Sequence, residues 1–180
     1  MSAARPFMSQ AHVKDTRTGQ RAADSMRTST VAVLELWDYS LIHYVVAARL
    51  AAASKCDVEK LEPPKILRYQ PGQTYRDHYD FIDPDVPAFA RELREKGQRT
   101  KTPLIYLNDA YTGGDTGFLA SGKSFRGDAG DALVLRNTRA GGKPDRDSLH
   151  AGLPPSQGEK WVYSTRVRTR PQIGRLWRDF

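Results

Sequence analysis

Short segments in which apolar and polar residues alternate, separated by glycine and proline, limit what this chain can fold into more than any other feature. Residues 65–70 and 73–80 alternate in this way, and Pro71-Gly72 between them is typical of a tight turn. The 14 glycines and 11 prolines are spread over many such gaps. Four further segments are predicted strands: 102–107, 116–119, 132–135 and 161–168. The pattern predicts an all-β sandwich or barrel with helical cover.

Helical spacing is clearest at residues 38–54, where Asp38 or Ser40 can cap the helix. Leu41, Tyr44, Val45 and Ala48 fall on one face, which we expect to cover a sheet. A second, short helix is expected around Phe89 and Leu93, inside a connection at 83–97 whose possible role as a lid the sequence leaves open. Residues 30–36 suit either a strand or the start of a helix.

The length of 180 residues suits one domain. We expect residues 1–30 to form a partly irregular lead-in with one short strand near 11–14, and residues 31–180 to form the domain proper. No run of about 18 apolar residues occurs, so we expect no membrane span, and the first 20 residues do not resemble a secretory signal. A single cysteine, Cys56, excludes an intramolecular disulfide and a cysteine-rich zinc site, which favours a cytoplasmic location.

The chain carries 28 Lys+Arg against 21 Asp+Glu, a formal charge of +7. A basic surface suits nucleic acid or an acidic protein, and it also simply keeps a protein in solution. The basic residues lack the interleaved aromatics of single-strand binders, so nucleic acid is not the expected partner.

His78, Asp80 and His150 are the candidate site residues. His78 and Asp80 lie two apart on a predicted strand, so their side chains share one face. Such a pair plus a distant histidine has the composition of the facial triad that holds non-haem Fe(II). Lys160 follows a predicted turn ten residues after His150; it is either a buried cation that needs an anion or a solvated lysine at a turn edge.

Ordered sequence blocks carry a family resemblance. They are Arg27-Thr28-Ser29, Leu67-Arg68-Tyr69, Gly72-Gln73-Thr74-Tyr75, His78-Tyr79-Asp80, Arg99-Thr100, Tyr106-Leu107-Asn108-Asp109, Gly113-Gly114-Asp115-Thr116-Gly117-Phe118, Gly130-Asp131-Ala132-Leu133, Leu149-His150-Ala151-Gly152 and Gly158-Glu159-Lys160-Trp161. With these blocks the chain resembles the 2-oxoglutarate- and Fe(II)-dependent dioxygenases of the prolyl 4-hydroxylase type.

The resemblance implies a mainly β (α+β) fold, a double-stranded β-helix or jelly roll with helical cover on one sheet. It implies His78, Asp80 and His150 as ligands of Fe(II), and Lys160, Tyr69 and Thr116 as contacts of the co-substrate 2-oxoglutarate. Tyr69 and Thr116 also suit a packed barrel interior. Ascorbate is an expected reductant.

Arg166 departs from the family, which often has a tryptophan six residues after the lysine, near the substrate mouth. A guanidinium there favours an acidic partner over a proline ring. Tyr75 is the other residue expected at this mouth or outside it. The entry strand and helix that usually precede the first block are not evident in residues 1–30.

The expected activity is hydroxylation of a prolyl residue in a peptide or protein, with succinate and CO2 as co-products. Two alternatives remain open: the same chemistry on an amino acid, a small metabolite or an alkylated base, and a non-catalytic jelly-roll binding module. The sequence leaves the oligomeric state open.

Overall fold

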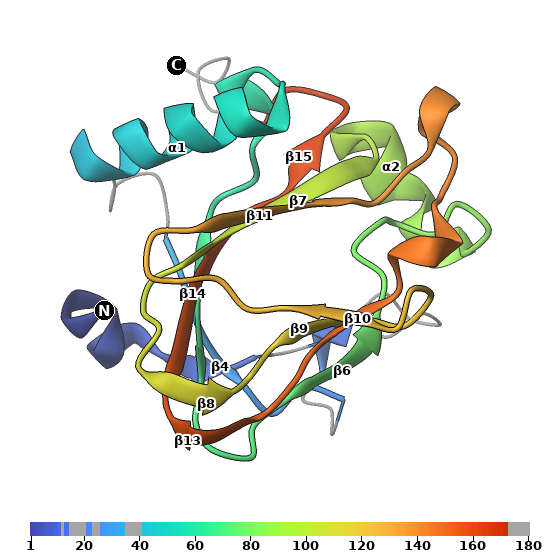
Figure 1. Ribbon diagram of the computed structural model, residues 1–180. Coiled ribbons are helices and arrows are strands. Elements are labelled where there is room, and N and C mark those ends of the chain that lie inside the picture. The colour runs from blue at the N-terminus through green and yellow to red at the C-terminus, as the bar shows by residue number, and fades with distance from the viewer. Residues whose placement is uncertain (12, 15–20, 23–25, 35–40, 173–180) are drawn as a thin grey trace.

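Two facing antiparallel sheets form the protein in the computed structural model (Figure 1), which describes residues 1–11, 13–14, 21–22, 26–34 and 41–172. The large sheet has the strand order β1-β4-β5-β14-β7-β11, with β15 also pairing with β7. Its strands are β1 (Ser9–Gln10), β4 (Thr30–Val33), β5 (Lys65–Tyr69), β14 (Lys160–Ser164), β7 (Arg99–Tyr106), β11 (Ala132–Arg136) and β15 (Val167–Arg168).

The small sheet has the order β10-β9-β12-β6 and lies across from β7 and β11 in Figure 1. Its strands are β6 (Tyr75–His78), β9 (Thr116–Phe118), β10 (Lys123–Phe125) and β12 (His150–Gly152). Two separate two-stranded sheets complete the described strands: β8 (Tyr111–Gly113) with β13 (Pro155–Gly158), and β2 (Val13–Lys14) with β3 (Arg21–Ala22).

Helices are few in the described part of the chain. The α-helices are α1 (Leu41–Ser54) and α2 (Ala90–Lys96), and the 3₁₀ turns are η1 (Ser2–Phe7), η3 (Val58–Lys60), η4 (Pro87–Phe89), η5 (Ala140–Gly142) and η6 (Arg146–Ser148). In Figure 1 α1 lies outside the sheets, next to β7 and β15. The predicted jelly roll with helical cover is therefore confirmed.

The predicted strands are confirmed with small shifts of their ends, because alternation marks strands better than strand ends. The predicted strand at 161–168 is divided into β14 and β15. The ambiguous segment 30–36 contributes a strand, β4. Its neighbour β1 lies within the predicted irregular lead-in, so part of that segment belongs to the large sheet.

The face predicted for the helix at 38–54 is wrong. Leu41 and Tyr44 are 78% and 57% exposed, whereas Leu50 and Ala51 are buried with Val46 and Ala47 packed beside them. Apolar residues surround most of this helix, so spacing alone selects no face. The proposed caps at 38 and 40 lie outside the described residues.

Alternation divides the central strands into an outer and an inner face. On the outer face Ile66, Trp161 and Tyr163 pack with Ala32 and Leu50 to form the main apolar core. The inner face lines a pocket between the sheets, with Leu67 and Tyr69 from β5 and Lys160, Val162 and Ser164 from β14. The sequence therefore places polar and charged side chains on the inner face of an otherwise apolar sheet.

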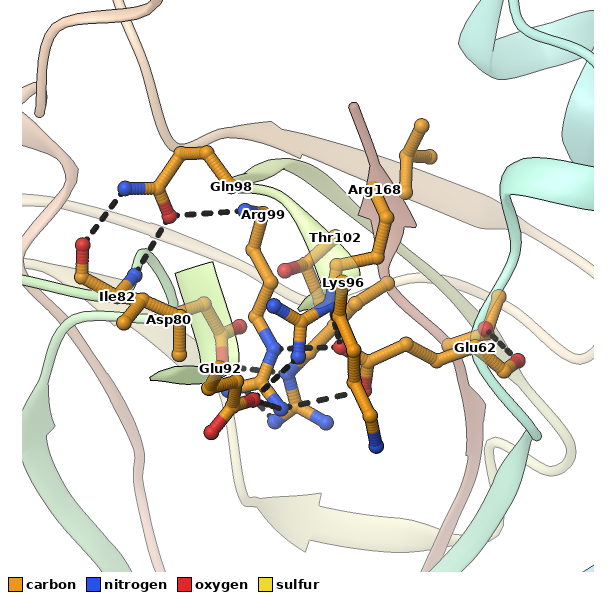
Figure 2. Close-up of polar contacts among 12 residues, drawn as sticks. Glu62, Asp80, Ile82, Glu92, Lys96, Gln98, Arg99, Thr102 and Arg168 are labelled. Carbon is orange, nitrogen blue, oxygen red and sulfur yellow. Dashed lines mark hydrogen bonds and ion pairs between the residues drawn. The ribbon is translucent and has the colours of Figure 1, made fainter. Parts of the chain in front are cut away.

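Ion pairs hold the connection at 83–97 against the large sheet. Glu92 of α2 accepts a hydrogen bond from Arg168 of β15. Gln98, which follows α2, bonds both backbone groups of Ile82 at 2.7 and 2.6 Å, as Figure 2 shows. The Glu92 contact therefore attaches α2 to β15, and the Gln98 contacts join the two ends of the connection.

Candidate metal centre and its pocket

The two small-sheet strands β6 and β12 bring the candidate ligands together. They pair antiparallel with His150 directly opposite His78, and Asp80 follows the end of β6. One ligand atom from each of His78, Asp80 and His150 lies within 4.8 Å of the others. Residues 72 positions apart in the sequence therefore form one cluster because of strand pairing.

Hydrogen bonds fix which nitrogen of each imidazole is available. Nδ1 of His78 lies 2.8 Å from the Arg76 carbonyl, and Nδ1 of His150 lies 2.9 Å from the Ser148 carbonyl. Because a carbonyl only accepts, each Nδ1 carries the hydrogen and each Nε2 keeps a free lone pair. Burial, and next the neighbouring His150, lower the pKa of His78 to about 3, so its ring is neutral. This is the state that a metal ligand needs.

Asp80 divides its two oxygens between two partners. Arg166 donates to Oδ1 from Nε at 2.9 Å and from a terminal nitrogen at 2.8 Å. The other oxygen, Oδ2, lies 3.6 Å from Nε2 of His150. Burial alone would raise the pKa of Asp80, but the Arg166 guanidinium holds it well below its usual value. Two Nε2 atoms and one carboxylate oxygen thus converge, and this donor set fits a divalent transition metal.

Lys160 lines the same pocket as the three candidate ligands. It is 2% exposed, and its ammonium donates to the Gly114 carbonyl at 2.6 Å and lies 5.4 Å from the ring centres of Tyr69 and Tyr106. Burial lowers its pKa to about 8. Among the described residues no carboxylate lies within ion-pair distance of Lys160. A buried ammonium without a counter-ion suits the carboxylate of a bound molecule.

Tyr69 and Thr116 line the pocket together with Lys160 and the three candidate ligands. The Thr116 hydroxyl lies 3.0 Å from the Tyr106 hydroxyl. A β-carbon at Gly152 would lie 3.0 Å from the Tyr69 hydroxyl, so the glycine gives the tyrosine a close fit against β12. Lys160, Tyr69 and Thr116, which the resemblance predicts as 2-oxoglutarate contacts, therefore line the same pocket.

Tyr75 and Arg166 also line the pocket. The Tyr75 ring stacks on His78 with the ring centres 3.4 Å apart, although strand alternation alone places Tyr75 on the opposite side. Arg166 is buried against Asp80, and sequence reasoning did not predict this ion pair. A substrate contact for either residue remains a prediction.

Arg27 lines the pocket and Tyr106 lies beside it against Thr116 and Lys160, and the sequence assigned no role to either. The Arg27 guanidinium lies 4.4 Å from the centre of the Tyr75 ring and donates to Ser29. Alternation along β7 was the available signal for Tyr106, because Thr102 and Leu104 on the same face line the pocket. Arg27 lay in a recognised sequence block, but nothing in its spacing indicated a site.

An antiparallel jelly roll with two imidazoles and one carboxylate facing inward defines a mononuclear metal protein of the facial-triad class. The chain belongs to the 2OG-Fe(II) oxygenase superfamily, whose family profile matches residues 64–167. Its relatives are of the prolyl 4-hydroxylase type. Among the described residues no helix is long and apolar enough to cross a membrane.

Two relatives illustrate the similarity. Prolyl 4-hydroxylase 1 of Arabidopsis thaliana is 31% identical over 93% of this chain and 62% of its own length. Prolyl 4-hydroxylase subunit alpha-1 of Rattus norvegicus is 32% identical over 94% of this chain and 31% of its own length. The chain thus spans less than two thirds of these curated relatives.

Solved structures agree on the fold. The viral collagen prolyl hydroxylase of Paramecium Bursaria Chlorella virus-1 superposes with a TM-score of 0.62 at 25% identity, covering 80% of each chain. A Pseudomonas putida prolyl-4-hydroxylase superposes with a TM-score of 0.59 at 20% identity, covering 92% of this chain and 80% of the other.

Proposed function

We propose that this protein is an Fe(II)- and 2-oxoglutarate-dependent dioxygenase that hydroxylates a prolyl residue in a peptide or protein, with succinate and CO2 as co-products. The main support for this proposal is one pocket that is lined both by the candidate ligands His78, Asp80 and His150 and by the buried Lys160. The curated relatives, which are prolyl 4-hydroxylases, support the choice of target.

Each pocket residue has a task in this proposal. His78, Asp80 and His150 hold Fe(II), with Asp80 and His150 buried and His78 half-buried. Lys160 binds the distal carboxylate of 2-oxoglutarate, while Tyr69 and Thr116 shape the walls around that carboxylate. Iron and 2-oxoglutarate together supply the oxidising chemistry that hydroxylates an unactivated C–H bond. Ascorbate serves as an external reductant.

The substrate approaches past Tyr75, whose ring forms one wall beside His78. We propose a peptide or protein with acidic residues near its target, because the basic chain, at +7, attracts such partners. A cytoplasmic location is part of the proposal and rests on the single cysteine.

Anaerobic titration tests the cofactors. Adding 2-oxoglutarate to the Fe(II)-loaded protein produces a visible charge-transfer band, which His150→Ala abolishes. Lys160→Met retains Fe(II) binding but requires at least tenfold more 2-oxoglutarate for the same band. Absence of the band from the wild-type protein contradicts the cofactor assignment.

Aerobic turnover tests the target. We expect proline-rich peptides to gain one oxygen by mass spectrometry, in step with succinate release. Peptides in which alanine replaces every proline are the control. Hydroxylation of both sets, or succinate formation only with a small metabolite or an alkylated base, contradicts prolyl hydroxylation while leaving the cofactor assignment intact.

A further inference from the structure

Lys65 is a cation on the pocket side of the large sheet that the proposed reaction does not use. It begins β5 and pairs directly with Ser164 of β14. Directly opposed residues of an antiparallel pair project to the same side of the sheet, and alternate residues of one strand share that side. Because Ser164 and Leu67 line the pocket, the Lys65 side chain lies on the pocket side as well.

This lysine lies opposite the pocket-lining Ser164, at the other end of the β5–β14 pairing from Lys160. Lys160 pairs with Tyr69, four residues along both strands from the pair of Lys65 with Ser164. Four residues of a β-strand span about 13 Å, so one small dicarboxylate bound at Lys160 does not serve Lys65. Its strand partner Ser164 precedes by two residues Arg166, which binds Asp80.

No acid neutralises Lys65 within the described residues: none forms a hydrogen bond or ion pair with its ammonium. Glu62 is the acidic group that acts on it, but this carboxylate accepts hydrogen bonds from Arg99 and Arg168. Asp80 is likewise occupied by Arg166.

The other charged groups that act on Lys65 are cations: Arg27, Arg99 and Arg166. Burial, together with these cations, lowers the pKa of Lys65 to about 7. Three cations and one acid therefore act on this half-buried ammonium, and a charge that is partly removed from water without a partner is costly. A ligand that brought an anion to this place would remove that cost.

We propose that Lys65 forms a subsite for the carboxylate of an acidic residue that flanks the target residue in the peptide substrate. This rests on the proposed function, and it makes Lys65 a specificity-determining residue. Free small carboxylates could bind an ammonium in the same way, so the experiments test them separately from the peptides.

Binding without turnover is the first test. The Mn(II)- and 2-oxoglutarate-loaded protein is titrated anaerobically with proline peptides that carry glutamate at one position, from three before to three after the proline, or glutamine at the same position. At one position at least, the wild-type protein binds the glutamate peptide about tenfold tighter. Lys65→Met loses this preference, Lys65→Arg keeps it, and the exposed control Lys143→Met keeps it. An equal preference in Lys65→Met overturns the proposal.

A labelling experiment needs no variant. Reductive methylation of the wild-type protein at pH 7.5 is followed by mass spectrometry at Lys65 and at Lys143. The glutamate peptide slows labelling of Lys65 several-fold and leaves Lys143 unchanged, whereas the glutamine peptide slows neither. Equal protection by the two peptides, or full protection by acetate, succinate or ascorbate at the same concentration, overturns the proposal. Hydroxylation without acid preference contradicts this subsite alone, and tight acidic-peptide binding without hydroxylation contradicts the proposed function alone.

Discussion

Asp80 shows how a single residue can be shared between a structural partner and a ligand site. Arg166 occupies Oδ1 with two donors, so only Oδ2 remains directed at the two histidines. A carboxylate held in this way has little freedom to turn, and the second oxygen is presented in one orientation. The guanidinium at the position where the resemblance predicts a tryptophan thus orients a proposed iron ligand.

Arg166→Met should therefore weaken metal binding. Loss of a partner that orients a metal ligand typically costs about 10–100-fold in metal affinity or activity, and we expect the same here. The measurement is the Fe(II) concentration that gives half of the charge-transfer band at saturating 2-oxoglutarate. Arg166→Lys should recover part of the loss, because it restores the charge and one donor. The matched control is Arg146→Met, which removes an exposed arginine paired with Asp83 and not with Asp80. An unchanged Fe(II) midpoint in Arg166→Met would show that Arg166 does not orient the ligand.

At the scale of elements, α1 illustrates how a helix with apolar residues all round chooses its buried face. Leu50 is 2% exposed and packs in the main core, while Leu41, nine positions earlier, is 78% exposed. The contact with the sheet, not the helix, makes this choice.

Leu50→Ala and Leu41→Ala separate the two faces. Removing the Leu50 side chain leaves a cavity in the core and should lower the free energy of unfolding by about 2–5 kcal/mol. Removing the Leu41 side chain should change it by less than about 0.5 kcal/mol. Urea unfolding followed by circular dichroism measures both. Equal losses would place the predicted face against the sheet after all.

The difference between local patterns and contacts across the fold explains which features could be predicted from the sequence. Alternation and turn residues located β5, β6 and β7, and the two-residue spacing placed His78 beside Asp80. By contrast, the ion pair of Arg166 with Asp80 joins residues 86 positions apart, and no local pattern encodes it. Tyr75 likewise turns toward His78 against the alternation of its strand. Local periodicity predicts elements, whereas contacts between them need the assembled sheets.

Across the whole molecule, one ion-pair cluster, centred on the buried Arg168 with partly buried neighbours, joins three parts of the fold. Figure 2 shows Glu62, which precedes β5, next to Arg99 of β7 and Arg168 of β15, with Glu92 of α2 on the other side of Arg168. Glu62 is shared by the two arginines, so its charge keeps both of them compensated. The connection at 83–97 is attached to the sheet through this cluster.

Glu62→Gln should therefore destabilise the whole protein, because it removes the acid that Arg99 and Arg168 share. Breaking a buried pair from one side costs about 3–5 kcal/mol, and the loss should appear in urea unfolding at pH 7.

Burial would raise the pKa of Glu62, but Arg99, Arg166 and Arg168 lower it from 4.5 to about 2. Since the folded pKa is the lower one, the stabilisation is fully present above pH 4.5 and is lost as the pH falls toward 2. The difference in the free energy of unfolding between wild type and Glu62→Gln should therefore become smaller as the pH falls from 4.5 toward 2. The exposed control Glu59→Gln should change stability by less than about 0.5 kcal/mol at pH 7. A constant difference from pH 7 to pH 2 would mean that the glutamate charge does not hold the cluster together.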